Sequence, residues 1–362
     1  MKRIAWITPE SYLDTDFYVV PLLCKEFQID WFIIYKDKFP YQREIKDLGK
    51  IDNLAIHPYQ QKYRLRSIQT AFSDMKLFLR IKREQYDIVY AGMFGFPYFH
   101  LLSSLILKRE KMVIAAHNVN TPKGAINYKW AKLYANYVLS VFKNFQTFSV
   151  SQHDLLLQMH PKKNVLMTPF LLKDYGMPTN EKSNHITFLT FGNIRDYKRI
   201  DVLIQAAQNT FEQTGKAFRV IIAGSCNDWD RYQKLLKYPE LFDLRIGRVE
   251  NEDIPNLFGE SHYFVTPYQD IAQSGSVVVG INYDCPIIAS DLEAFREYIK
   301  DGETGFLIKP ADVKELTKVM TKIVESNNAC YEDLKEGVAK MKERDFAPHS
   351  IANKYISFFN NI

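Results

Sequence analysis

FLTFGNIRDYKRIDVLIQAA, residues 188–207, is the stretch that decides the fold. Its first residues form a short apolar run that predicts a buried β-strand, and its last residues have the apolar spacing of one helix face. Gly192 lies between them and allows the tight turn that joins the two elements. A strand, a turn and a helix in this order are the first part of a βαβ unit. The stretch therefore predicts a parallel α/β sheet.

Short apolar or aromatic runs of the same kind recur along the whole chain, with helical patterns between them. The runs are continuous rather than alternating, which is typical of strands buried on both faces of a parallel sheet. The alternation restarts after residues 173–185, a polar stretch that indicates a linker. The sequence thus predicts two doubly wound α/β domains. The expected strands are Ile4–Ile7, Trp31–Tyr35, Ile88–Tyr90, Met112–Ala116, Phe145–Val150, Val165–Met167, Ile186–Phe191, Val220–Ala223, Tyr263–Thr266, Ile287–Ala289 and Phe306–Ile308.

Length and composition exclude several classes of protein. The chain has 362 residues, 46% hydrophobic and 25% charged, which excludes a disordered or fibrous protein and suits two domains. Its four cysteines lie far apart without a CxxC pair, which favours a reducing compartment and argues against a zinc site. No apolar run approaches the roughly 18 residues of a spanning helix, and Ile4–Ile7 is too short for a signal peptide. We expect a cytoplasmic protein.

The charge is unevenly distributed along the chain. Residues 1–178 contain 25 Lys and Arg against 15 Asp and Glu, whereas residues 179–362 contain 22 against 27. Nucleic acid, an anionic membrane or an acidic acceptor would each explain the basic half. Residues 61–84 hold seven basic and two acidic residues and have apolar residues at helical spacing, which is typical of a helix at a membrane surface. An ordinary helix with a solvated basic rim fits equally well. We favour a peripheral position at the inner face of an anionic membrane, and no nucleic acid partner, because no recognition motif occurs.

Two loops predict a site for a diphosphate. Arg195 and Lys198 lie near the start of the helix that follows Gly192, where unpaired N–H groups and the helix dipole favour an anion. A second strand ends at Pro267, and a small-residue segment around Ser274–Ser276 then opens another helix. Each loop alone also fits a plain helix start with solvated basic residues or a serine N-cap. Together, in one domain, they favour a diphosphate.

These residues carry a resemblance to a known family. The order of Gly192, Arg195 and Lys198, then Ser274-Gly275, the run from Pro286 to Asp291, Glu297 and the turn from Asp301 to Phe306 resembles the C-terminal half of family 4 glycosyltransferases over about residues 186–310. The resemblance implies an α/β protein of the GT-B fold, with two Rossmann-like domains facing a cleft and a C-terminal helix that crosses back. The implied domains are residues 1–172 on the acceptor side, residues 186–340 for the nucleotide sugar, and a returning helix at 341–362.

The resemblance also implies an activity and its residues. It implies a retaining glycosyltransferase that moves a sugar from a nucleoside diphosphate sugar to a glycan or lipid-linked acceptor, in surface polysaccharide or glycoconjugate biosynthesis. Arg195 and Lys198 would stabilise the departing diphosphate, so we expect neither a metal ion nor another cofactor. His117, placed directly after an expected strand, would contact the donor sugar. The further donor-binding candidates are Gly192, Asn193, Ser274, Gly275, Ser276 and Glu297.

The first half offers candidates for the acceptor side. Asp14 and Asp16 follow the first expected strand, and Asn118 follows His117. They suit contacts with hydroxyl groups, although solvated loop carboxylates and a turn-forming asparagine explain them as well.

The chain departs from the family pattern in one place. Family members usually have two glutamates separated by seven residues, the second of which binds the nucleotide ribose. Between Ile271 and Tyr283 this sequence has no carboxylate. Asp270 lies near the position of the first family glutamate, and a valine of the Val277–Val279 run stands at the position of the second glutamate. A non-catalytic protein that binds a glycan or a nucleotide sugar is therefore the alternative function.

Overall fold

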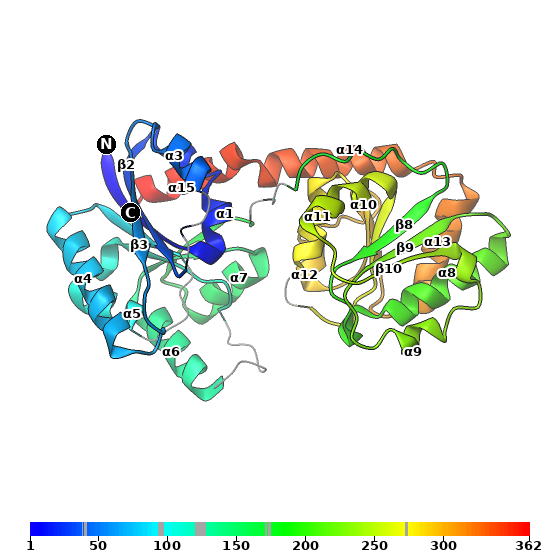
Figure 1. Ribbon diagram of the computed structural model, residues 1–362, viewed down its shortest axis with the longest axis horizontal. Coiled ribbons are helices and arrows are strands. Elements are labelled where there is room, and N and C mark those ends of the chain that lie inside the picture. Colours follow the sequence, from blue (N-terminus) through cyan, green and yellow to red (C-terminus); the bar gives the residue numbers. More distant parts are fainter. Residues whose placement is uncertain are drawn as a thin grey trace. The chain divides into compact units, whose positions relative to one another are not determined.

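The computed structural model describes two compact units in the chain (Figure 1). Unit 1 comprises Met1–Leu171 and Asp345–Ile362, and unit 2 comprises Leu172–Arg344. The described residues are all those of the chain except 38, 40–41, 93–97, 120–127, 171, 173–174 and 272–273.

Unit 1 is built on a seven-stranded sheet in which every neighbouring pair of strands runs parallel. The strand order is β3-β2-β1-β4-β5-β6-β7, so the chain moves outward from β1 in both directions. The residues of Ile4–Ile7 have no exposed surface, as expected for a strand buried on both faces. The strands are β1 (Lys2–Pro9), β2 (Phe27–Tyr35), β3 (Leu54–Gln60), β4 (Ile88–Ala91), β5 (Met112–Ala115), β6 (Asn144–Thr147) and β7 (Asn164–Met167).

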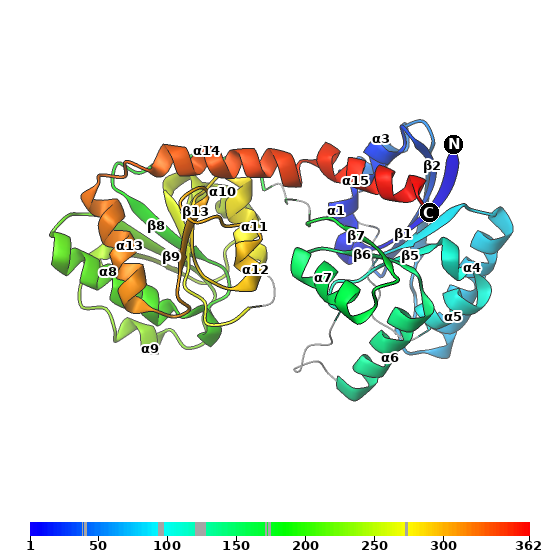
Figure 2. The same cartoon turned by 180° about the vertical axis from the view of Figure 1, so that it is seen from behind.

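Helices cover both faces of this sheet (Figures 1 and 2). Ile4 and Trp6 belong to one apolar core with α2, α3 and α15, whereas Ala5 and Ile7 belong to a second core with α4, α5, α6 and α7. Alternate residues of β1 therefore serve opposite faces, as the pleat of a strand requires. The helices are α1 (Leu13–Asp16), α2 (Val20–Leu23), α3 (Gln42–Leu48), α4 (Ile68–Glu84), α5 (Phe99–Ile106), α6 (Tyr128–Val141), α7 (Val150–Met159) and α15 (Pro348–Asn360).

Unit 2 repeats this architecture with six parallel strands in the order β10-β9-β8-β11-β12-β13. Helices α8 and α13 pack on one face, and α10 and α11 pack against Phe264 on the other. The prediction of two parallel α/β sheets is confirmed. The elements are β8 (Thr187–Phe191), α8 (Ile200–Thr214), β9 (Arg219–Gly224), α9 (Asp230–Gln233), β10 (Phe242–Ile246), α10 (Ile254–Glu260), β11 (Tyr263–Thr266), α11 (Gly275–Asn282), β12 (Ile287–Ser290), α12 (Glu293–Arg296), β13 (Gly305–Ile308), α13 (Val313–Glu325) and α14 (Tyr331–Met341).

The C-terminal helix α15 is part of unit 1. Its Tyr355 and Phe359 are buried, and their rings lie 5.4 Å and 6.2 Å from the ring of Trp6 in β1. The last residues of the chain thus complete the core around the first strand.

The basic segment 61–84 differs from the expected single helix. Helix α4 begins only at Ile68, because the side chain of Ser67 accepts a hydrogen bond from the backbone N–H of Thr70 and caps it. Leu77, Phe78 and Ile81 are buried in the core, whereas Ile68, Phe72 and Leu79 are exposed. Among the described residues, no helix is long and apolar enough to cross a bilayer.

Candidate functional site

The candidate donor site lies at the topological switch point of unit 2. Strand β8 is flanked by β9 on one side and β11 on the other, so the connections from β8 and β11 leave in opposite directions. In open parallel sheets this divergence forms a crevice at the carboxyl ends of the strands, where ligands bind. The loop from Gly192 to Lys198 follows β8, and the loop from Pro267 to Ser274 follows β11. The backbone N–H of Gln269 donates to the carbonyl of Tyr197 at 2.8 Å and joins the two loops.

Two glycines shape the first loop. Gly192 has a φ of +103°, and its N–H donates to the carbonyl of Ala223 at the end of β9. Gly224 has a φ of +148°, and a Cβ added there would lie 2.2 Å from the carbonyl oxygen of Gly192. The two backbones approach so closely that no side chain fits between them. This contact fixes the path of the chain toward Arg195 and Lys198.

Lys198 is a buried cation without a counter-ion. Its residue is 8% exposed, and among the described residues it has neither an ion-pair nor a hydrogen-bond partner for its ammonium. The ammonium lies 5.4 Å from the ring centre of Tyr268. Burial, helped by the charge of Arg195, lowers the pKa of Lys198 to about 8. An anion that enters the crevice would stabilise the protonated ammonium of Lys198.

The neighbouring cations behave differently from Lys198. Arg195 is exposed and precedes the 3-10 turn Asp196–Lys198. Arg199 has a φ of +50°, and its guanidinium pairs with Asp201 at 2.8 Å. Arg195 and Lys198 are therefore the two cations available for a ligand in this loop.

The second loop presents hydroxyl groups next to Lys198. Ser274 occupies the N-cap position of α11 but forms no capping hydrogen bond; its Oγ lies 3.0 Å from Oγ of Ser276 instead. The phenol of Tyr268 lies 3.3 Å from the same Ser276 oxygen. Gly275 is exposed, with open space where a Cβ would project. The first turn of α11 thus keeps backbone N–H groups free of a side-chain cap, which suits an anion.

The remaining donor-side predictions also lie in unit 2. Asn193 is exposed in the glycine turn, and Glu297 is half-buried at the end of α12. Burial, with a smaller contribution from the charge of Glu297, raises the pKa of Tyr298. The run Val277–Val279, one residue of which stands where the family has its second glutamate, lies in α11, and Val277 and Val279 are buried there. The positions of these residues do not decide whether they bind the donor, so their donor roles stay predictions.

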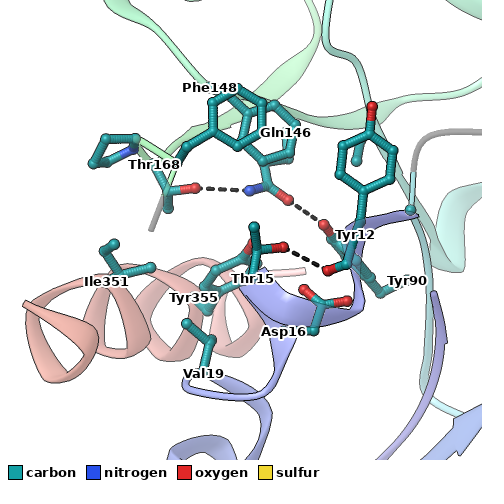
Figure 3. A pocket seen from close by; sticks show the side chains of 14 residues that line it. Tyr12, Thr15, Asp16, Val19, Tyr90, Gln146, Phe148, Thr168, Ile351 and Tyr355 are labelled. Carbon is teal, nitrogen blue, oxygen red and sulfur yellow. Dashed lines mark hydrogen bonds between the residues drawn. The ribbon is translucent and has the colours of Figure 1, made fainter. Parts of the chain in front are cut away.

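Unit 1 contains a pocket at the carboxyl edge of its own sheet (Figure 3). The side-chain amide of Gln146 in β6 lies at its centre, donating to Oγ1 of Thr168 at 2.7 Å and accepting from the phenol of Tyr90 at 2.5 Å. Tyr355 of α15 and Asp16 of α1 also line it. Phe148 and Phe170 stack face to face along the wall, with ring centres 4.3 Å apart. The free volume of the pocket is about 30 Å³, which suits a polar group of a ligand rather than a whole sugar ring.

His117 lies next to this aromatic pair. Its ring centre is 5.2 Å from that of Phe170, in an edge-to-face arrangement. Its buried Nδ1 has no hydrogen-bond partner among the described residues, and burial lowers the pKa of its imidazole. His117 is therefore neutral near pH 7.

The acceptor-side candidates have different surroundings. Asp16 is buried rather than solvated, because its Oδ2 accepts hydrogen bonds from Nε1 of Trp6, at 2.9 Å, and from the hydroxyl of Thr8. Asn118 is exposed, and the side chain of Asp14 lies outside the described part of the structure.

The chain contains two Asp-x-Asp triplets, at residues 14–16 and 228–230. In the described part of the chain, neither belongs to a group of three His, Cys, Asp or Glu residues that could hold a metal ion.

Sequence reasoning missed most of the pocket in unit 1. Gln146 offered the best signal, since a glutamine inside a continuous apolar strand must find partners when it is buried. Tyr90, Thr168 and Tyr355 gave no such signal, because only the fold brings them together.

Two Rossmann-like units, each built on an open parallel sheet, are the architecture of the GT-B fold. Residues 177–341 match the family described as Glycosyl transferases group 1. The predicted resemblance to glycosyltransferases is thus confirmed over most of unit 2.

Solved structures confirm the GT-B fold over the whole chain. A glycosyltransferase from Rickettsia africae is 18% identical, with 99% of this chain and 98% of that chain covered and a TM-score of 0.71. HepE from Anabaena, in complex with UDP and glucose, is 14% identical, with both chains fully covered and a TM-score of 0.68. Sucrose-phosphate synthase from Thermosynechococcus elongatus is 13% identical, covering 100% and 99%, with a TM-score of 0.68. No curated protein matches the chain.

Proposed function

We propose that this protein is a retaining glycosyltransferase that moves a sugar from a nucleoside diphosphate sugar to a glycan or lipid-linked acceptor. The observation that carries the proposal is the buried, unpaired Lys198 beside Arg195 at the switch point of unit 2. A cation in this position is costly to the free protein and is compensated only when an anion binds. The diphosphate of a donor has the required charge.

The proposed chemistry is electrostatic. As the bond between the anomeric carbon and the diphosphate breaks, negative charge accumulates on the leaving oxygen, and Arg195 and Lys198 stabilise it without a metal ion. The backbone N–H groups at the start of α11 add further donors. The resemblance to family 4 supports retention of configuration, and a membrane-linked or surface glycoconjugate made in the cytoplasm fits as the product.

For the acceptor we propose the pocket of unit 1. Its free volume is about 30 Å³, so it would take one polar group of an acceptor sugar, which its hydroxyl and amide groups suit. Asp16, Asn118 and His117 stay candidates for contacts with the sugars.

One observation favours the second candidate function, a non-catalytic protein that binds a nucleotide sugar or a glycan. A valine of the Val277–Val279 run replaces the glutamate that family members use for the ribose, so any nucleotide must be held differently. The transferase and a nucleotide-sugar-binding protein share the diphosphate site and differ in turnover, whereas a glycan-binding protein would not need that site.

The test combines binding with turnover. UDP, GDP and ADP and their glucose conjugates are first compared by thermal shift, because a ligand that binds the folded state raises its apparent stability. The best donor is then followed for release of nucleoside diphosphate, with and without oligosaccharide acceptors. Binding with release supports the transferase, and binding without release in any acceptor supports the non-catalytic candidate. No binding to any nucleotide, in a folded protein, would refute both the transferase and a protein that binds a nucleotide sugar.

A further inference from the structure

The outward side of α4, α5 and α6 in unit 1 is unusually apolar. Seven of the sixteen large apolar side chains that are exposed among the described residues lie on these three helices, and two more, Tyr63 and Leu65, lie just before α4. Unit 2 has only Met177, Tyr197 and Leu235. On α4, Ile68, Phe72 and Leu79 are exposed, with Phe72 at 55%. Their spacing of four and seven residues places them on one side of the helix.

The same outward side continues on the next two helices. Leu101 and Leu105 are exposed on α5, and Trp130 and Leu133 are exposed on α6, with Trp130 at 73%. These pairs are four and three residues apart, so each shares one helix side. We call the exposed side chains of α4, α5 and α6 the outer helical surface. Scattered exposed leucines are ordinary, but a concentration of this kind on neighbouring helices indicates an interaction site.

The three helices are neighbours in space (Figures 1 and 2). The rings of Phe78 in α4 and Phe99 in α5 are 4.8 Å apart, and Nδ1 of His100 in α5 lies 2.7 Å from the phenol oxygen of Tyr134 in α6. Because these inner side chains hold the helices to one another and to the sheet, the outer ones have no role in the core.

The positive charge of the first half of the chain is concentrated on these helices and their flanks. Residues 61–84, 98–111 and 128–143 together contain 13 Lys and Arg but only 3 Asp and Glu. This excess of ten positive charges equals the excess over all of residues 1–178. The remaining residues of that half therefore contain equal numbers of basic and acidic side chains. Lys76 and Arg83 are exposed in the same stripe as Phe72 and have no ion-pair partner among the described residues, and the same holds for Lys132 on α6.

We propose that the outer helical surface docks unit 1 on an anionic lipid membrane, with Trp130 and the exposed leucines entering the headgroup region and the lysines and arginines contacting lipid phosphates. The combination of apolar side chains, an exposed tryptophan and a basic rim is the chemistry of an interfacial helix. A second copy of this chain fits less well, since a two-fold interface would place two surfaces of the same positive charge against each other. The proposal is independent of the transferase activity.

The test measures binding of the full chain to vesicles of equimolar phosphatidylcholine and phosphatidylglycerol, and to vesicles of phosphatidylcholine alone. We expect binding to the anionic vesicles that weakens as salt rises, with a blue shift of tryptophan emission. Trp6 and Trp31 are buried, so Trp130 is the reporter on this surface, and Trp130→Phe should remove the shift. The absence of binding to anionic vesicles would overturn the proposal.

Two variants separate the charges from the apolar side chains. Lys76→Glu/Arg83→Glu/Lys132→Glu should lower binding about a hundredfold or more, given the contribution of each basic residue near a charged leaflet. Its matched control is Lys234→Glu/Lys314→Glu/Lys318→Glu, which makes the same charge change at exposed positions of unit 2 and should bind as the wild type does. If both triple variants lost vesicle binding equally, the proposal would be overturned, because the total charge of the protein alone would then explain binding.

The apolar variant is Phe72→Ser/Leu105→Ser/Leu133→Ser, compared with Met177→Ser/Leu235→Ser in unit 2. All five side chains are exposed, so both variants should fold, which circular dichroism checks. We expect the first to lose at least about tenfold in vesicle binding and the second to lose nothing. Unchanged binding of the first variant would overturn insertion, and a dimer of the wild type that this variant dissociates would assign the surface to a second copy instead.

Discussion

Replacing Lys198 by methionine should stabilise the free protein and abolish its response to a nucleoside diphosphate. Burial, with a contribution from Arg195, lowers the pKa of Lys198 from 10.5 to about 8. At 1.36 kcal/mol for each pKa unit, the protonated ammonium costs the folded state about 3 kcal/mol. Methionine has a similar shape and no charge, so Lys198→Met removes this cost.

The pH dependence of the effect has a definite sign. Below pH 8 the ammonium is protonated in both the folded and the unfolded chain, and the whole cost is present. Between pH 8 and 10.5 only the unfolded chain keeps the proton, so the stability of the wild type rises toward that of the variant. By pH 9.5 the remaining difference should be about 1.4 kcal/mol.

Calorimetry of both proteins at pH 7 and pH 9.5, with and without UDP, GDP and ADP, checks this prediction. For a domain of this size, about 3 kcal/mol corresponds to a rise in Tm of about 6 to 12 °C at pH 7. The diphosphate that stabilises the wild type most should have little effect on the variant. Lys182→Met is the matched control, since the ammonium of Lys182 donates to the carbonyls of Phe258 and Ser261 and its loss should leave the diphosphate response intact. A Lys198→Met protein that is no more stable than the wild type and binds the diphosphate equally well would refute the argument.

Three further predictions follow from the fold and the site. Gly224→Ala should weaken diphosphate binding by at least about tenfold without removing a charge, because its Cβ would collide with the carbonyl of Gly192; titration calorimetry measures the affinity, and wild-type affinity would contradict the proposed role of this turn. Phe359→Ala should destabilise unit 1 by about 3–5 kcal/mol, as for other buried aromatics; denaturant unfolding measures it, and a cost below 1 kcal/mol would show that α15 is dispensable. Transfer should persist in EDTA, since Arg195 and Lys198 would neutralise the diphosphate in place of a metal ion; activity that disappears and returns with magnesium would contradict this.

Part of the donor site could be predicted from sequence because it is local. Gly192, Arg195 and Lys198 lie within seven residues, and a strand followed by a glycine turn and a helix places such residues at the edge of a sheet whatever surrounds them. The burial of Lys198 was not predictable. It depends on Tyr268, from the next loop of the site, and on the close contact between Gly192 and Gly224, which lies at the end of a different strand.

The sequence by itself determined the two parallel α/β units, because continuous apolar runs at βαβ spacing have few other ways to bury both faces of a strand. Only the tertiary structure decided where individual side chains point. The apolar residues of α4 share one helical pattern, yet Leu77 and Phe78 are buried and Phe72 and Leu79 are exposed. Likewise Gln146 meets Tyr90 and Thr168 only because β4, β6 and the end of β7 come to one edge of the sheet. Burial and hydrogen bonding depend on neighbours that are distant in the chain, and periodicity along a single segment carries no information about them.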